Sequence, residues 1–169
     1  MSDDDGATLV SGLFEQHRSA IYAYIRRLTA DTGLAEELTQ ETFLRVFEAR
    51  ARLKQVVNLK AWVFRVATNT TFSALRRHRR YTWLPWEAAE RRGASSQDVA
   101  ERVGLEDAVE RALVSLTPQY RAPLLLFGHY GFSVAETAEI LGISEGAVKT
   151  RVYRAKELFQ QAYERGNRK

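Results

Sequence analysis

Apolar side chains recur every three to four residues through the first part of the chain, which is the spacing of helices that bury one face. A first helix is predicted over residues 9–28, with its apolar stripe at Val10, Leu13, Phe14, His17, Ile21, Tyr24, Ile25 and Leu28. Asp31 can cap a second helix over residues 33–52. After a polar loop over residues 53–59, a third helix is expected over residues 60–80.

Further helical patterns follow, and no segment shows the alternation of a strand. Residues 83–97 contain proline, glycine and consecutive serines without a sustained period, which indicates a linker. A fourth helix is expected over residues 99–115. Thr117 then caps a fifth, with Pro118 in its first turn, and Pro123 should kink that helix or delay its start.

These elements predict an all-α fold with two small helical domains. The expected boundaries are residues 1–82 for the first domain, 83–104 for the linker and 105–169 for the second domain.

A helix-turn-helix is predicted near the end of the chain. Ser133 and Glu136 have the spacing of a capping box, so a short helix should begin at Val134. Gly142 can take the left-handed conformation that ends this helix, and Ser144 can cap the next one. Such a motif places its second helix in the major groove of DNA.

The second helix of this motif divides into an apolar face and a basic face. Its apolar face carries Val148, Val152, Ala155, Phe159 and Ala162. The opposite arc carries Gly146, Lys149, Thr150, Tyr153, Arg154 and Glu157, flanked by Arg151 and Lys156. Lysine, arginine and threonine can bond base edges, and the two flanking bases can hold phosphate. A solvated basic helix is the alternative interpretation.

The charge distribution adds a second basic segment to this picture. The net charge is only +4, but residues 49–86 contain nine basic residues and no acid, and residues 145–169 carry a net +4. The segments before each of these are net acidic, at −5 over residues 1–48 and −4 over residues 87–144. Two separated basic segments are expected of a chain that contacts a polyanion at two places.

The third predicted helix has a face suited to single-stranded DNA. Its core arc holds Val63, Val66, Ala67, Thr70 and Ala74, and the other side holds Trp62, Arg65, Asn69, Phe72, Arg76, Arg79 and Arg80. Aromatic rings among arginines can stack bases and hold phosphates. Two structural explanations compete, because Trp62 could pack under the preceding loop and the terminal arginines suit a helix C-terminus.

The second predicted helix carries an exposed leucine among acidic and amide side chains. Its apolar arc holds Leu34, Leu38, Thr42, Phe43, Val46 and Phe47, and its other arc holds Glu37, Gln40, Glu41, Leu44, Arg45 and Glu48. Leu44 ringed by these polar groups suits docking on a basic protein surface, although single exposed leucines are common.

Other classes of function have no support in the sequence. The chain has no cysteine, its three histidines lack ligand spacing, and neither a nucleophile elbow nor a phosphate-binding glycine loop is present. We therefore expect no metal, no cofactor, no small-molecule substrate and no enzymatic activity. An acidic N-terminus and the lack of a long apolar run favour a cytoplasmic protein.

Three segments together resemble the extracytoplasmic-function sigma factors, small members of the sigma-70 family of bacterial RNA polymerase subunits. The segments AEELTQETFLRVF (35–47) and WVFRVATNTTFSALRRHRR (62–80) look like region 2 of this family. The segment LTPQYRAPLLLFGHYGFSVAETAEILGISEGAVKTRVYRAK (116–156) looks like region 4. Thr137 departs from the family pattern, which usually has an aliphatic residue there.

The resemblance implies partners and residue roles. The partners are core RNA polymerase, through its β′ clamp helices and β flap, promoter DNA, and an anti-sigma factor. The polymerase contact falls on Gln40, Glu41 and Phe43, with Glu37 and Leu44 beside them. Asn69 corresponds to the position that holds a flipped base of the minus-ten element, near the loop at residues 53–60. Lys149, Thr150, Tyr153 and Arg154 correspond to the readers of the minus-thirty-five element.

The alternative function is an autonomous helix-turn-helix regulator that binds duplex DNA by itself. Such a regulator has no use for the Trp62, Asn69 and Arg76 face, so the N-terminal half favours the sigma-factor interpretation.

Overall fold

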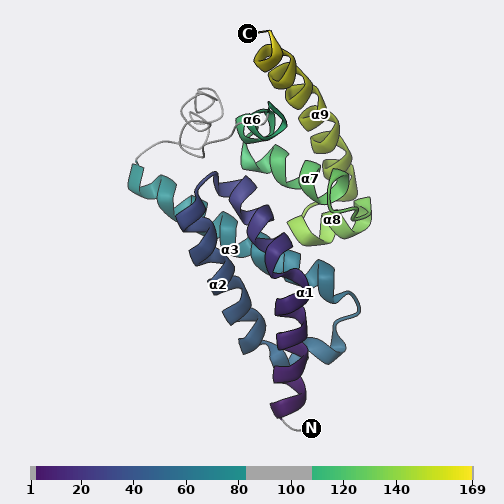
Figure 1. Cartoon of the computed structure of the whole chain (residues 1–169). Helices are drawn as coiled ribbons and strands as arrows, with labels where there is room; N and C mark the ends of the chain where they lie inside the picture. Colours follow the sequence, from purple (N-terminus) through teal and green to yellow (C-terminus); the bar gives the residue numbers. More distant parts are fainter. Residues whose placement is uncertain (1–2, 83–107, 169) are drawn as a thin grey trace.

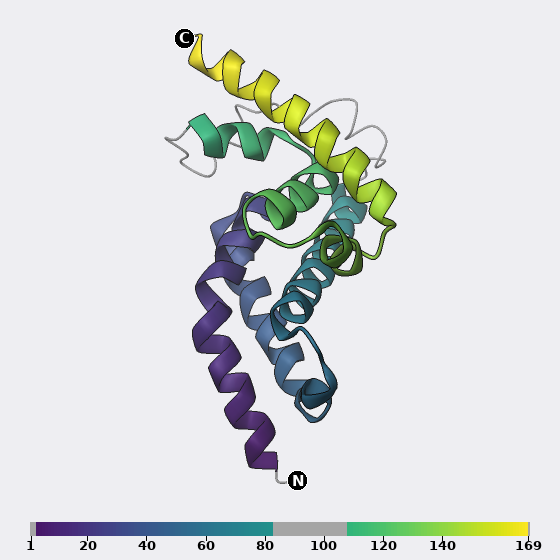
Figure 2. The same cartoon turned by 90° about the vertical axis from the view of Figure 1, so that its right-hand side faces the viewer.

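The computed structural model describes residues 3–82 and 108–168, and all the regular structure within these ranges is helical. Three long segments form the N-terminal half: α1 (Asp3–Thr29), α2 (Thr32–Glu48) and α3 (Leu59–Thr82), with the short 3₁₀ helix η1 (Arg50–Gln55) before α3. They lie side by side as a bundle in Figures 1 and 2.

Four helices form the C-terminal half: α6 (Ala108–Ser115), α7 (Pro118–Gly128), α8 (Val134–Leu141) and α9 (Glu145–Asn167). They cover one end of the N-terminal bundle, and α9 crosses that end with the C-terminus at its tip (Figure 2). The two ends of the chain lie at opposite ends of the molecule (Figure 1). The predicted all-α class is confirmed for the described residues.

The predicted stripe of the first helix forms the centre of the N-terminal core, with one exception. Ile21, Tyr24 and Ile25 are fully buried. Phe14 was expected in the same stripe, but its ring is 38% exposed and meets Phe43 edge-on at 5.0 Å between ring centroids. The ring therefore lies at the rim of the core.

The sequence pattern predicted the start of α2 correctly, but it predicted the end of this helix several residues too late. The Asp31 side chain accepts a hydrogen bond from the backbone N–H of Leu34 at 2.9 Å, which confirms the predicted cap. The second helix was predicted to continue to residue 52, but α2 ends at Glu48, and η1 covers the last predicted residues of this helix and the first part of the expected loop. This change of helix type buries Leu53, which is 1% exposed.

The helix α7 starts where it was predicted to start, but the predicted cap differs. Thr117 has the extended backbone of a cap residue, yet its side chain makes no capping hydrogen bond. The helix begins at Pro118 and continues through Pro123, so the second proline does not delay its start. The predicted linker and the predicted start of the fourth helix near residue 99 lie outside the described residues.

Aromatic residues join the two halves into one core. Tyr130 and Phe132, in the loop after α7, contact the ring of Phe64 in α3 at centroid distances of 4.8 and 5.1 Å. Tyr24 of α1 meets both Phe64 and Tyr130. One cluster of buried apolar residues therefore runs from α1, α2 and α3 into α7 and α8.

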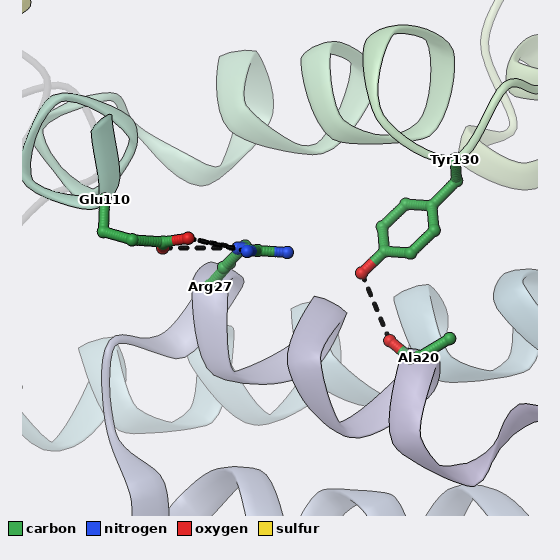
Figure 3. Close-up of polar contacts among 4 residues, drawn as sticks. All are labelled: Ala20, Arg27, Glu110 and Tyr130. Carbon is green, nitrogen blue, oxygen red and sulfur yellow. Dashed lines mark hydrogen bonds and ion pairs between the residues drawn. The ribbon is translucent and has the colours of Figure 1, made fainter. Parts of the chain in front are cut away.

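Polar contacts fasten the same junction (Figure 3). The guanidinium of Arg27 in α1 pairs with the carboxylate of Glu110 in α6 through both of its oxygens, at 2.6 Å for the shortest contact. The hydroxyl of Tyr130 donates to the carbonyl of Ala20 at 3.2 Å. A two-point contact of arginine with carboxylate is more directional than a simple ion pair, so it fixes the position of α6 against α1.

A buried arginine completes the junction. Arg121 in α7 is 5% exposed, and its guanidinium donates to the carbonyls of Arg27 and Leu28 at the end of α1 and to those of Val114 and Leu116 at the end of α6. Burial lowers the pKa of Arg121 to about 10, so the group is charged at neutral pH. One guanidinium therefore donates hydrogen bonds to carbonyls at the ends of two helices, where intrahelical donors are missing.

Replacing this cation should destabilise the whole chain. We expect Arg121→Met to lower the free energy of unfolding by about 3 kcal/mol or more, because buried carbonyls lose charge-assisted donors. Urea unfolding followed by circular dichroism measures the change. Arg165→Met removes an exposed arginine from α9 and should change stability by less than about 0.5 kcal/mol. Equal effects from the two variants would contradict the role given to Arg121.

Candidate nucleic-acid interface

The helix-turn-helix forms as its sequence predicts. The Ser133 side chain accepts from the backbone N–H of Glu136 at 3.0 Å, and the Glu136 carboxylate accepts from the backbone N–H of Ser133 at 2.7 Å. Gly142 ends α8 with φ +65°, and Ser144 caps α9 through the N–H of Ala147 at 3.1 Å. The capping box, the turn and the second cap are all confirmed.

The first part of α9 has the two faces that were expected, whereas Phe159 and Ala162, farther along the predicted apolar face, are only half-buried. Val148 and Ala155 are fully buried, and Val152 is nearly so. The predicted DNA-contacting residues lie on the outside: Lys149, Thr150, Tyr153, Arg154 and Lys156 are exposed, and Arg151 is half-buried. Tyr153 is the most prominent apolar ring among them, at 68% exposure. The motif therefore presents a basic, hydrogen-bonding helix face to solvent.

Thr137 of α8 is a polar residue at a position that is usually aliphatic in the family that the chain resembles. The side chain is completely buried, and its hydroxyl has no hydrogen-bond partner. The position is thus used as an apolar one despite its hydroxyl, which costs some stability.

The predicted single-strand face of α3 is partly exposed and partly packed. Arg65, Asn69 and Arg76 are exposed, whereas Trp62 and Phe72 are half-buried and pack against the main core. The structural explanation for Trp62 therefore holds for part of its ring. The side chains of Arg79 and Arg80 lie outside the described residues.

A cavity brings the two predicted DNA-contacting helices together. Arg76 of α3 and Arg151 of α9 both line a space of about 300 Å³ between the domains. The apolar part of the lining is Phe72, Leu75, Pro118 and Leu141, which come from α3, α7 and α8. Two arginines expected on separate stretches of DNA thus line the same cavity here.

Most of the α2 residues that were predicted to dock on a partner are exposed, with two differences from the prediction. Leu44 is 58% exposed, Glu37 and Gln40 are exposed, and Glu41 forms an ion pair with Arg45 at 2.6 Å. Phe47 was expected in the core but is 42% exposed, and the Arg50 guanidinium lies 4.4 Å from its ring centroid.

Phe43 differs from these neighbours because it points inward. It is 6% exposed and packs edge-on against Phe14. Little of its ring is available to a partner, whereas Leu44 and Phe47 together give this surface an apolar centre.

The sequence analysis did not identify roles for Asn58, which precedes α3, or for Lys60, which lies in its first turn. Asn58 caps α3 by accepting from the N–H of Ala61 at 3.0 Å, and its amide donates to Glu136 of α8 at 2.9 Å. Lys60 donates to the carbonyl of Tyr130 at 3.4 Å and lies 4.9 Å from the centroid of the Phe132 ring. An asparagine at the position before a helix is a recognisable capping signal in a sequence. The bond from Asn58 to Glu136, in contrast, joins distant parts of the chain, and no local sequence signal indicates it.

Lys60 also influences a histidine in the core. His17 is 8% exposed. Its pKa is lowered mainly by this burial and, to a smaller extent, by the nearby charge of Lys60. Neutral His17 is therefore favoured at neutral pH. Within residues 3–82 and 108–168, no group of three histidine or acidic residues is arranged to hold a metal ion. None of the helices described here is long and apolar enough to cross a membrane.

The described residues form an all-helical protein with a helix-turn-helix and exposed basic side chains on α3 and α9. Family models for sigma-70 region 2 and sigma-70 region 4 match residues 13–81 and 106–159. The chain is 31% identical to the extracytoplasmic-function (ECF) sigma factor SigL of Mycobacterium tuberculosis over 88% of this chain and 85% of that protein. It is 30% identical to SigW of Bacillus subtilis over 86% of this chain and 83% of that protein. The chain belongs to the ECF sigma factors of the sigma-70 family.

Other similar proteins agree with this assignment. The chain is 30% identical to SigE of Mycolicibacterium smegmatis, although it spans only 58% of that protein. A similar solved structure is the sigma factor RpoE of Bartonella quintana in complex with the anti-sigma factor NepR. The match covers 91% of this chain and 96% of that chain, with a TM-score of 0.68 and 25% identity. CnrH, in complex with the cytosolic domain of CnrY, shares the fold at a TM-score of 0.67, over 96% of this chain and 94% of its own with 20% identity.

Two glycines of the helix-turn-helix should respond oppositely to alanine. Gly142→Ala forces an alanine into a left-handed conformation and should destabilise the chain by about 1 kcal/mol. Gly146→Ala adds a methyl group to the first turn of α9, where the nearest atom is 3.9 Å away, and should stabilise by up to about 1 kcal/mol. Urea unfolding of both variants measures the difference, and destabilisation of similar size in both would contradict the turn conformation.

Proposed function

We propose that this sigma factor contacts its promoter through the exposed faces of α9 and α3. The observation that carries the proposal is the exposure of Lys149, Tyr153 and Arg154 on the second helix of a correctly capped helix-turn-helix. Promoter and polymerase binding are properties of the family.

In this proposal α9 reads the minus-thirty-five element in the major groove. Lys149 and Arg154 bond base edges, and Thr150 and Tyr153 complete the surface. The ion pair between Arg154 and Glu157, at 3.1 Å, is exposed and therefore weak, so Arg154 can exchange it for DNA. Arg151 and Lys156 hold phosphates beside the bases.

The exposed part of α3 captures the opened strand at the minus-ten element. Asn69 receives a flipped base, and Arg65, one turn before it, holds the backbone phosphate. Arg76 extends this basic face toward the C-terminal end of the helix, where Arg79 and Arg80 follow in the sequence. Trp62 contributes the exposed part of its ring to stacking.

The α2 surface docks on core polymerase. Glu37, Gln40 and Glu41 provide acidic and amide groups around the exposed Leu44, which suits the basic surface expected of the β′ clamp helices. Phe43 supports this surface from beneath, because its ring is buried against Phe14.

The remaining partners follow from the family. The C-terminal domain contacts the β flap, and an anti-sigma factor holds the protein inactive, as the RpoE structure is in complex with NepR. The protein acts in the cytoplasm, where transcription takes place. It has no bond-making chemistry of its own, since sigma factors are not enzymes.

Substitutions on α9 should change promoter binding without affecting polymerase binding. We expect Lys149→Ala and Arg154→Ala each to weaken binding of the holoenzyme to its promoter by about 1–3 kcal/mol if the residue contacts a base. Binding to core polymerase should be unchanged, because neither residue belongs to the α2 surface that is proposed to dock on polymerase. Fluorescence anisotropy with duplex promoter DNA and with core polymerase separates the two effects. Unaltered preference among promoters in both variants would refute the assignment.

Run-off transcription tests both the overall function and the role of Asn69. With core polymerase and candidate promoters from its own genome, the wild-type chain should produce promoter-specific transcripts. Asn69→Ala should reduce transcription from closed duplex, and a template melted in advance at the minus-ten element should partly restore it, because base capture stabilises the open strand. Full activity of Asn69→Ala on closed duplex would argue against base capture. The absence of any specific transcript with the wild type would argue against the function.

A further inference from the structure

We propose that the cavity lined by α3, α7, α8 and α9 is a binding site for a small amphipathic anion, a molecule with one carboxylate or phosphate head and an apolar body. When such an anion is bound, it withdraws Arg76 and Arg151 from DNA and weakens promoter binding. The binding site rests on the cavity alone, whereas the effect on the promoter also rests on the proposed DNA contacts of α3 and α9.

The cavity has the size and the lining of a small-molecule site. Its volume of about 300 Å³ lies at the lower end of the range of about 300–1,000 Å³ that such sites occupy. Much of its wall is apolar and comes from three helices, through Phe72, Leu75, Pro118 and Leu141. A wall of this kind binds the apolar part of a ligand by removing its surface from water.

The polar part of the lining is cationic. Arg76 and Arg151 contribute guanidinium groups, Gln119 adds an amide, and the described lining contains no acidic residue. Within residues 3–82 and 108–168 neither arginine forms an ion pair, and the Arg76 side chain donates to the hydroxyl of Ser73 at 3.1 Å. A guanidinium can hold a carboxylate or a phosphate through two parallel hydrogen bonds. A bound anion also relieves the repulsion between the two like charges.

The start of α7 adds positive potential to the same cavity. Pro118 and Gln119, the first two residues of this helix, belong to the lining, and the Thr117 side chain makes no capping hydrogen bond. The N-terminus of a helix carries a partial positive charge that stabilises nearby anions. Positive charge from α3, α7 and α9 therefore converges on one apolar cavity, and this combination favours an amphipathic anion over a neutral or a cationic ligand.

Occupancy of the cavity competes with DNA for the same two arginines. In the proposed promoter contacts, Arg151 holds a phosphate beside the minus-thirty-five element, and Arg76 extends the single-strand face of α3. Each basic side chain that is withdrawn from phosphate lowers the affinity for DNA, because fewer counterions are released. The promoter affinity of this sigma factor then depends on the concentration of the anion.

Decanoate, a medium-chain fatty acid anion, is a suitable probe for the full-length chain. We expect saturable binding of one molecule per chain in isothermal titration calorimetry, below the concentration at which decanoate forms micelles. Neutral decanol should bind at least about tenfold more weakly, since it cannot pair with the arginines. Decyl phosphate presents the other head group, and the tighter of the two anions identifies the head that the site prefers.

Substitutions in the lining test the site directly. Arg76→Met/Arg151→Met keeps apolar stems but should weaken decanoate binding at least about tenfold, because both charge-assisted contacts are lost. Leu75→Trp should also weaken it, because the larger side chain fills the cavity while both arginines remain. Arg165→Met, near the end of α9 and outside the lining, is the matched control and should bind decanoate as the wild type does. Circular dichroism checks that each variant is folded.

Nuclear magnetic resonance locates the bound probe. The amide signals of Leu75, Gln119 and Leu141 should shift in proportion to saturation. Shifts confined to other surfaces, the absence of saturable binding, or equal binding by the wild type and the double-arginine variant would each overturn the proposed site.

Promoter binding tests the effect on function. Saturating decanoate should weaken binding of the wild-type holoenzyme to promoter DNA at least about threefold in fluorescence anisotropy. The Leu75→Trp holoenzyme keeps both arginines without the site, so its promoter affinity should not respond to decanoate. Unchanged affinity of the wild type at saturation, or an equal loss in both holoenzymes, would refute the regulatory effect. If decanoate bound at the cavity of a wild type that recognised no promoter, the site would stand and the proposed promoter function would fail.

Discussion

One buried guanidinium determines how the two halves of this sigma factor meet. Arg121 has no carboxylate partner for its charge in the part of the chain that is described, and it is instead surrounded by backbone carbonyls from the ends of α1 and α6. Removing a charge from water is costly unless such donors and acceptors are matched. The ends of α1 and α6 are therefore held to one point of α7.

The position of α7 also determines where the rest of the C-terminal domain lies. The loop after α7 places Tyr130 and Phe132 between α1 and α3, and α8 then lies against α3. Ile140 of α8 belongs to the main core, whereas Ala138 belongs to a small separate cluster with Val148 and Val152 of α9. Helix α9 also packs against α6 and α7, so the helix-turn-helix is joined to the whole C-terminal domain and not to α8 alone.

The features that could be predicted from the sequence depend on neighbouring residues. The capping box at Ser133, the left-handed Gly142 and the two faces of α9 all arise within one or two helical turns, so local patterns are sufficient. Phe47 was misplaced because a helical wheel shows which residues share a face but not how wide the covered part of that face is. The bonds from Arg121 to α1 and from Asn58 to α8 join residues more than 75 positions apart, and a single sequence contains no local signal for such pairs.

Electrostatics and packing act against each other where the two halves meet. The helix α3 comes from a segment of net +9, the final helix α9 lies in a segment of net +4, and Arg76 and Arg151 line one cavity. Repulsion between these like charges weakens as salt screens it, whereas the buried contacts of Arg121 and Phe132 are screened much less. The buried contacts must therefore outweigh a repulsion that is strongest at low salt.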